Sequence, residues 1–385
     1  MKLYLLCSFA LVALSASSFD VHTQHFINDG QDSSLVPLLD LHRELVERNS
    51  VTGSEHNISR YLDAHLRAIG FHTELQPVID GRENVFAYLG HKRETRVLVT
   101  SHIDTVPPYI PYERRGDTIW GRGSADAKAS VAAQITAVKR LYDERQIDEG
   151  DVALLFVVGE EKDGHGMKTA NDLGLSWESV IFGEPTELKL ATGHKGGLAF
   201  TISAAGIAGH SGYPEVGRNA IDILVQGLSA LSQLQLPGSD RFGNTTLNVG
   251  LIEGGKAANV IAQNASAVVM VRIASDDLDG IKTLIQHAVT TASPWLEIDF
   301  LSPGIPPVPI DSDIEGFETV IVNYGTDIPS LKGSHKRYLY GPGSILVAHS
   351  AHEHVDVADL STAVDGYERL ITQVLERPRP ILWKP

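Results

Sequence analysis

The chain has 385 residues, of which 43% are hydrophobic and 21% charged, a composition typical of a soluble globular protein long enough for two domains. Its 48 Asp and Glu residues outnumber its 32 Lys and Arg residues, and the formal net charge is −16. This balance argues against nucleic acid and against an anionic membrane surface as partners.

The first residues have the pattern of a secretory signal peptide. Lys2 supplies a positive charge, an apolar stretch runs from Leu3 to Leu14, and the small residues 15–17 suit cleavage. The apolar stretch is too short to span a bilayer. We therefore expect residues 1–17 to be removed and the protein to be secreted, in preference to a buried N-terminal helix.

Cysteine and glycosylation patterns agree with an extracellular location. The only cysteine, Cys7, lies in the signal segment, so the mature chain is expected to have neither a disulfide nor a thiol nucleophile. Three Asn-x-Ser/Thr sequons, at Asn57, Asn244 and Asn264, are candidate glycosylation sites. A single sequon is weak evidence, because several occur by chance in a long chain.

Helices and strands alternate in the first half of the chain. Amphipathic helices are predicted at 35–48 and 54–69, the second with Ser54 as its N-cap and Gly70 at its end. Further on, the pattern predicts strands at 85–89 and 96–100, a helix at 127–142, and buried strands at 151–158 and 180–182. This order predicts an α/β domain with a mostly parallel sheet flanked by helices.

The pattern changes near residue 193. The following segments indicate strand, helix, two strands, helix and strand, at 198–204, 219–236, 245–252, 266–274, 277–291 and 296–300. This order resembles a split βαβ sandwich of about one hundred residues. The proline-rich segment Ser302–Pro309 reads as the linker out of it.

The remaining segments complete the larger domain. A helix is predicted at 315–324, a strand at 338–339 and a helix at 357–375. We therefore expect an α+β domain at 195–306 inserted into a larger domain that is formed by 35–194 and 307–385.

Acidic and histidine motifs follow three of the predicted strands directly. His102 and Asp104 follow the first, the pair Glu160 and Glu161 the second, and Glu184 the third. In open α/β sheets, ligands bind at the carboxyl ends of the parallel strands. Imidazole nitrogen and carboxylate oxygen are ligands that zinc accepts, so the sequence predicts a metal-dependent hydrolase.

Each motif also has a plainer interpretation. Asp104 lies two residues beyond His102 and can orient it, or the pair is structural. Asp126 precedes a helix, where its carboxylate can lie between two cations or can stabilise the helix dipole. Of the adjacent Glu160 and Glu161, one can bind metal while the other takes a proton from water, or both belong to a solvated turn.

A late histidine is needed to complete the ligand set. His349, His352 and His354 all follow the glycine-rich Gly341–Ser344, and chemistry alone does not rank them. The chain has no Walker-type phosphate loop and no Gly-x-Ser-x-Gly elbow, which disfavours serine hydrolase chemistry.

Taken in order, these motifs resemble those of the co-catalytic zinc metallopeptidases of family M20, which include carboxypeptidases, aminoacylases and acetylornithine and succinyl-diaminopimelate deacylases. The resemblance runs from about Leu35 to the C-terminus. It implies two Zn²⁺ per chain, with Glu160 as general base and Asp104 orienting His102. Asp126 would bridge the two ions, His102 and Glu184 would serve one of them, and Glu161 and His349 the other. The family's His-x-x-x-Glu pattern, matched by 349–353, selects His349.

The inserted segment resembles the family's lid and dimerisation domain. His210 in Gly209-His210-Ser211 matches a histidine that stabilises the oxyanion, often from the partner subunit. Asn259, Arg272 and Gly343 match positions that contact the substrate. The resemblance favours a homodimer through this domain, although family members also occur as monomers.

The sequence therefore predicts a secreted zinc hydrolase of amide bonds, a metallocarboxypeptidase that releases C-terminal residues from peptides. The alternative is an N-acyl-amino-acid deacylase, because Gly183–Thr186 resembles the deacetylase branch. A non-catalytic binding protein would have lost a metal ligand or the general base. Here the base Glu160 is present, and so are all five ligands that the resemblance implies: His102, Asp126, Glu161, Glu184 and His349.

Overall fold

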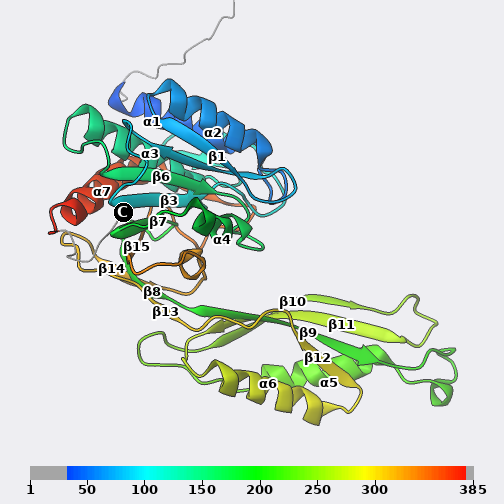
Figure 1. The fold of residues 1–385 in the computed structure, drawn as a ribbon. Helices are drawn as coiled ribbons and strands as arrows, with labels where there is room; N and C mark the ends of the chain where they lie inside the picture. Colours follow the sequence, from blue (N-terminus) through cyan, green and yellow to red (C-terminus); the bar gives the residue numbers. More distant parts are fainter. Residues whose placement is uncertain (1–32, 379–385) are drawn as a thin grey trace, which may run out of the picture. The chain divides into compact units, whose positions relative to one another are not determined.

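The computed structural model describes residues 33–378 (Figure 1). The predicted signal peptide, with Cys7, lies outside the described residues. Within 33–378, no helix has both the length and the apolar character needed to cross a membrane.

A six-stranded sheet forms the larger part of the fold. Its strand order is β1-β2-β6-β3-β7-β15. Strands β6, β3, β7 and β15 are mutually parallel, and β1 and β2 extend the sheet in antiparallel fashion. The strands are β1 His72–Pro77, β2 Glu83–Tyr88, β3 Val97–His102, β6 Val152–Val157, β7 Ser179–Gly183 and β15 Lys336–Tyr340. The mostly parallel sheet is thus confirmed, and the full burial of β3, β6 and β7 explains their apolar sequences.

Helices cover this sheet (Figure 1). Helix α2 packs on β1 and β2, α3 packs on β3 and on α7, and α4 packs on β2 and β6. The helices are α1 Val36–Glu47, α2 His56–Ala68, α3 Lys128–Asp143, α4 His165–Ala170 and α7 Val357–Leu375, with short 3₁₀ turns at Ser33–Leu35, Asn171–Leu173 and Ile328–Ser330. Leu98, Leu155 and Phe182 point to one face of the sheet, where they pack with Met167 of α4.

Two small sheets complete this part of the chain. One has the order β13-β8-β14, and its apolar side chains join the core beside α4. The other has the order β16-β5-β4. Their strands are β8 Leu190–His194, β13 Val308–Pro309, β14 Thr319–Val322, β4 Glu113–Arg115, β5 Thr118–Trp120 and β16 His354–Asp356.

The intervening segment forms a four-stranded antiparallel sheet, of order β10-β11-β9-β12, with two helices on one face. Its elements are β9 Gly196–Ala205, a 3₁₀ turn at Pro214–Val216, α5 Ala220–Ser232, β10 Thr246–Gly254, β11 Asn264–Ile273, α6 Leu278–Ala292 and β12 Leu296–Phe300. The predicted order of strand, helix, two strands, helix and strand is confirmed. The exact domain boundaries at 195 and 306 stay a prediction.

Two local predictions are wrong. The helix expected at 315–324 is instead strand β14, because the β-branched run Thr319–Val322 pairs in parallel with β8. Ser54 does not cap α2: the N-cap is Glu55, which makes no side-chain capping bond, and the Ser54 amide donates to the carbonyl of Val51. Strands β1 and β8 and helix α4 were not predicted from the sequence.

Candidate metal centre

The candidate site lies at the carboxyl ends of four parallel strands. His102 is the last residue of β3, Glu160 and Glu161 follow β6, and Glu184 directly follows β7. The loop after β15 carries His349 to the same place, because β15 pairs in parallel with β7. The structure therefore brings together residues that the sequence analysis could only place on separate strands.

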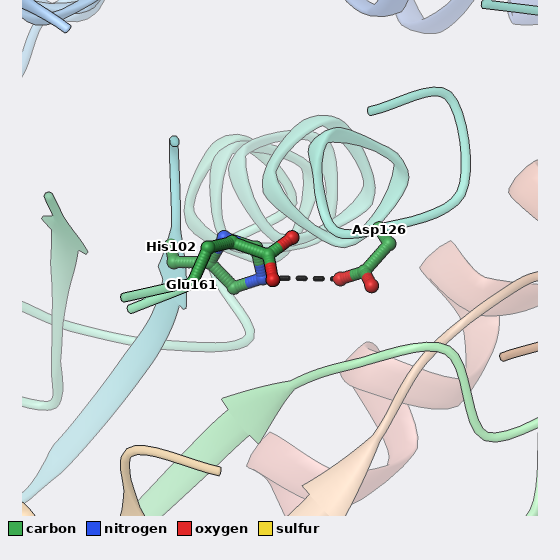
Figure 2. Close-up of side chains that lie close together, drawn as sticks. All are labelled: His102, Asp126 and Glu161. Atoms are coloured by element: carbon green, nitrogen blue, oxygen red, sulfur yellow. Dashed lines mark hydrogen bonds and ion pairs between the residues drawn. The ribbon is translucent and has the colours of Figure 1, made fainter. Parts of the chain in front are cut away.

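Asp126 lies between the two histidines. Its Oδ1 is 3.1 Å from Nε2 of His102, and its Oδ2 is 3.3 Å from Nε2 of His349. Figure 2 shows Asp126 in the loop before α3, facing His102 at the end of β3, with Glu161 beside them. Each carboxylate oxygen thus faces a different imidazole, as a carboxylate shared by two cations requires.

Glu184 lies beside His102, and Glu161 lies beside His349. Oε2 of Glu184 is 3.7 Å from Nε2 of His102, and Oε2 of Glu161 is 2.9 Å from Nε2 of His349. Ligand atoms of His102, Asp126 and Glu161 lie within 4.8 Å of one another, as do those of His102, Glu160 and Glu184. The pairs of Glu184 with His102 and of Glu161 with His349 match the predicted division, whereas the first cluster joins Glu161 to His102 as well. The assignment of ligands to two ions stays a prediction.

The site concentrates buried negative charge. Burial, with Glu184 nearby, raises the pKa of Glu160 well above its usual range, and burial raises the pKa of Glu184 to about 7. Burial alone would raise the pKa of Asp126, but its hydrogen bonds with His102 and His349 lower it. Carboxylates buried at this density are costly without cations, so the donor set fits divalent metal.

Asp104 contacts both His102 and the glutamate pair. Nδ1 of His102 is 3.0 Å from the backbone oxygen of Asp104 and 3.6 Å from its carboxylate. The carboxylate instead accepts hydrogen bonds from the amides of Glu160 and Glu161, at 3.0 and 3.2 Å, and from the hydroxyl of Thr52. Asp104 therefore orients His102 through its backbone and holds the glutamate pair through its side chain.

Three other buried side chains near the site received no role in the sequence analysis. His42 of α1 hydrogen-bonds the carbonyl of Ser124, and Glu353 contacts the backbone of the Asp126 loop. Asp327 lines a small cavity with Glu160, and its Oδ2 has no hydrogen-bond partner within the described residues. Only Glu353 had a sequence signal, its place in the His-x-x-x-Glu pattern.

His210 and Asn259 lie together on the inserted segment. The amide of Ser211 donates to the carbonyl of Asn259, and His210 forms a β-bridge with Val260. The amide of Gly212 donates to Nδ1 of His210, which leaves Nε2 as the ring nitrogen that carries hydrogen. Both His210 and Asn259 are exposed.

Arg272 and Gly343 have different surroundings. Arg272 is the penultimate residue of β11, and no hydrogen bond or ion pair engages its guanidinium within residues 33–378. Gly343 is buried with φ of +77°, and a Cβ there would lie 3.0 Å from Cβ of Ala125. That close approach gives a structural reason for glycine, and a substrate contact by Gly343 stays a prediction.

Fold and site together define the class: a metal-dependent hydrolase with an inserted α+β domain. Residues 192–297 match the peptidase dimerisation domain, and residues 84–177 match peptidase family M28. A peptidase M20 domain-containing protein of Schizosaccharomyces pombe is 47% identical over 347 residues, 88% of this chain and 86% of the relative. A protein of Aspergillus clavatus named as a probable carboxypeptidase is 44% identical over 373 residues, 89% of each chain.

Solved structures share the fold. A tripeptidase from Staphylococcus aureus has a TM-score of 0.72 at 24% identity, covering 89% of this chain and 98% of that one. A family M20 metallo-carboxypeptidase from Sulfolobus solfataricus has a TM-score of 0.68 at 17% identity, covering 89% and 99%. The chain belongs to peptidase family M20, and it is an enzyme of the peptidase class.

Proposed function

We propose that the protein is a secreted dizinc carboxypeptidase that removes C-terminal residues from peptides. The observation that carries this proposal is Asp126 with one histidine at each carboxylate oxygen and Glu160 beside them. His102, Asp126 and Glu184 would hold one ion, and His349, Asp126 and Glu161 the other. A dinuclear metal-binding peptidase of the same family from Bacillus subtilis shares the fold, with a TM-score of 0.63.

Preference for a C-terminal residue is supported by Arg272. Its guanidinium is without a partner in the described part of the chain, burial lowers its pKa, and the charge of Glu160 acts on it. A cation placed near the general base suits a carboxylate one residue away from the bond to be cleaved. Relatives named as probable carboxypeptidases agree with this choice.

The two ions, Glu160 and His210 have different roles in the proposed reaction. When bound, the two ions would polarise the scissile carbonyl and lower the pKa of the attacking water. Glu160 accepts a proton from that water and then donates it to the leaving nitrogen. His210 donates a hydrogen bond from Nε2 to the developing oxyanion.

The position of His210 supports a contribution from a partner subunit. His210 forms a bridge with Val260, which precedes the start of β11 at Asn264, whereas Arg272 lies near the end of this strand. Asn264 and Arg272 are roughly 26 Å apart at about 3.3 Å per residue of extended strand. One active site would therefore combine Arg272 of its own chain with His210 of a second copy.

The inserted sheet also has a surface suited to a second copy. Strand β10 is an edge of the sheet, and its Leu251 and Ile252 are 61% and 62% exposed. An unpaired edge with exposed apolar side chains favours pairing with another chain. We therefore propose a homodimer through residues 195–306.

The predicted signal peptide at residues 1–17 supports the proposal that the protein is secreted. The three sequon asparagines, Asn57, Asn244 and Asn264, are all exposed, so each is accessible for glycosylation. Intact mass measured before and after enzymatic deglycosylation would test their occupancy in secreted protein.

A substrate panel tests the proposed activity. Purified protein is assayed against N-blocked dipeptides with a free C-terminus, the same dipeptides as C-terminal amides, and N-acetyl amino acids, each with and without chelator. We expect chelator-sensitive cleavage of the free-acid dipeptides. Faster cleavage of N-acetyl amino acids would favour the deacylase, and activity unaffected by chelator would exclude both.

A further inference from the structure

Glu353 connects two segments that carry metal ligands. It lies four residues after His349, immediately before β16, and its side chain is buried, with 2% of the residue exposed. Its carboxylate turns toward the loop that precedes α3, which carries Asp126. The backbone joins the same two segments, because the amide of Gly121 donates to the carbonyl of Glu353.

One oxygen of Glu353 accepts three backbone hydrogen bonds. Oε1 receives the amides of Gly123 at 2.9 Å, Ala125 at 3.2 Å and Asp126 at 3.1 Å. Amides converging on one point form a concave site for an anion. The Glu353 carboxylate fills that site and so fixes the backbone of this loop.

The second oxygen of Glu353 is held from the other side. Nη1 of Arg122 lies 2.6 Å from Oε2 of Glu353, and both side chains are almost fully buried. Nε of Arg122 also donates to the carbonyl of Pro108, at 3.3 Å. The carboxylate is therefore held between a guanidinium and three amides, which restricts its position.

This restriction matters because Asp126 has to face two partners at once. Its two oxygens lie 3.1 and 3.3 Å from different imidazoles, so a small rotation of its backbone would spoil both contacts. We propose that Glu353 is a positioning residue that couples Asp126 to His349 and thereby sets the affinity of both metal sites. This inference rests on the dinuclear centre of the proposed function.

A merely structural role is the alternative, and the chain contains a matched control for it. Arg96 and Glu178 form a second buried pair, with two hydrogen bonds of 3.0 Å and side chains 10% and 7% exposed. Glu178 directly precedes β7 and Arg96 directly precedes β3, so this pair lies at the opposite ends of the strands from the metal centre. Removing this pair should lower the free energy of unfolding and leave zinc affinity unchanged.

The test compares Glu353→Gln with Glu178→Gln in the full-length protein. The amide side chain introduced by Glu353→Gln retains an acceptor for the three backbone amides but loses the charge that faces Arg122. Zinc affinity of the apo-protein is measured by competition with a chromogenic chelator. We expect Glu353→Gln to weaken both sites by about 10- to 100-fold, as loss of a residue that orients metal ligands does, and Glu178→Gln to bind zinc as the wild type does.

Hydrogen exchange provides a readout that needs no substrate. In apo Glu353→Gln, amides of residues 121–127 should exchange faster than in the wild type, with little change elsewhere. If Glu353→Gln is too unstable to purify, Glu353→Asp replaces it, since this variant keeps the charge and withdraws the carboxylate by one methylene.

Wild-type zinc affinity in the Glu353 variants, or an equal loss in Glu178→Gln, would overturn the proposal. The outcome is separate from the choice of substrate. A protein that binds two zinc ions but cleaves no C-terminal residue would contradict the carboxypeptidase assignment and leave the affinity comparison valid.

Discussion

Nε2 of His349 lies 2.9 Å from Oε2 of Glu161, although the two residues are 188 positions apart in the chain. The contact arises because β15 runs parallel to β7 and directs the following loop to the edge where β6 ends. Hydrogen bonds with Asp126 and Glu161 raise the pKa of His349 to about 10.

Substitutions of Asp126 and of His349 should lower the zinc content of the protein to different extents. Asp126→Ala removes the carboxylate shared by both sites, so we expect this variant to lose both zinc ions on gel filtration. His349→Ala removes a ligand of one site only and should retain roughly one ion per chain. Elemental analysis checks this, and equal zinc content in the two variants would contradict the bridging role of Asp126.

Substitutions of Glu160 and of Glu161 should separate the loss of proton transfer from the loss of metal binding. We expect Glu160→Ala to lower kcat by at least about a hundredfold with zinc retained, because the general base is lost while the ligands remain. Glu161→Ala, its neighbour, should instead lose zinc. Near-normal turnover in Glu160→Ala would remove that residue from the mechanism.

The contribution of Arg272 should depend on the substrate's C-terminus. Hydrogen bonds to charged groups contribute about 1.5–3 kcal/mol, so we expect Arg272→Met to lower kcat/KM for free-acid dipeptides by roughly 10- to 100-fold. The matched C-terminal amides, which lack the carboxylate, should change little. An equal loss on acids and amides would indicate that Arg272 stabilises the fold rather than the substrate.

The strand-end positions of the site were predictable, and its internal contacts were not. An apolar run that ends in His102 or in Glu160 and Glu161 identifies both a buried strand and its functional end, because parallel strands share one edge. The contacts of Glu353 and Asp327 depend on loops that return from distant parts of the chain. Local periodicity carries no information on such contacts.

Local sequence is also a poor guide where pairing with a distant strand decides the structure. The run Thr319–Val322 falls within a predicted helix, yet it lies beside β8, more than one hundred residues earlier in the chain. Ser54 has a residue type suited to capping, but α2 begins only at His56. Residue preference alone does not fix such boundaries.

His42 should make the stability of the protein sensitive to acid. Burial lowers the pKa of His42 to about 4, from 6.5. Between these values the unfolded chain binds a proton that the folded protein does not, so the free energy of unfolding falls as pH drops from 6.5 to 4. The whole shift corresponds to roughly 3 kcal/mol for this one group.

Replacement by a residue that does not titrate should remove this contribution. In His42→Gln the side-chain amide can still donate to the carbonyl of Ser124, which His42 contacts at 2.9 Å. We expect the variant to lose less stability than the wild type between pH 6.5 and 4, measured by urea unfolding of both apo-proteins. Other buried histidines contribute equally to both proteins, so the difference isolates His42. If the two proteins lose the same stability between pH 6.5 and 4, folding does not lower the pKa of His42, and the prediction is wrong.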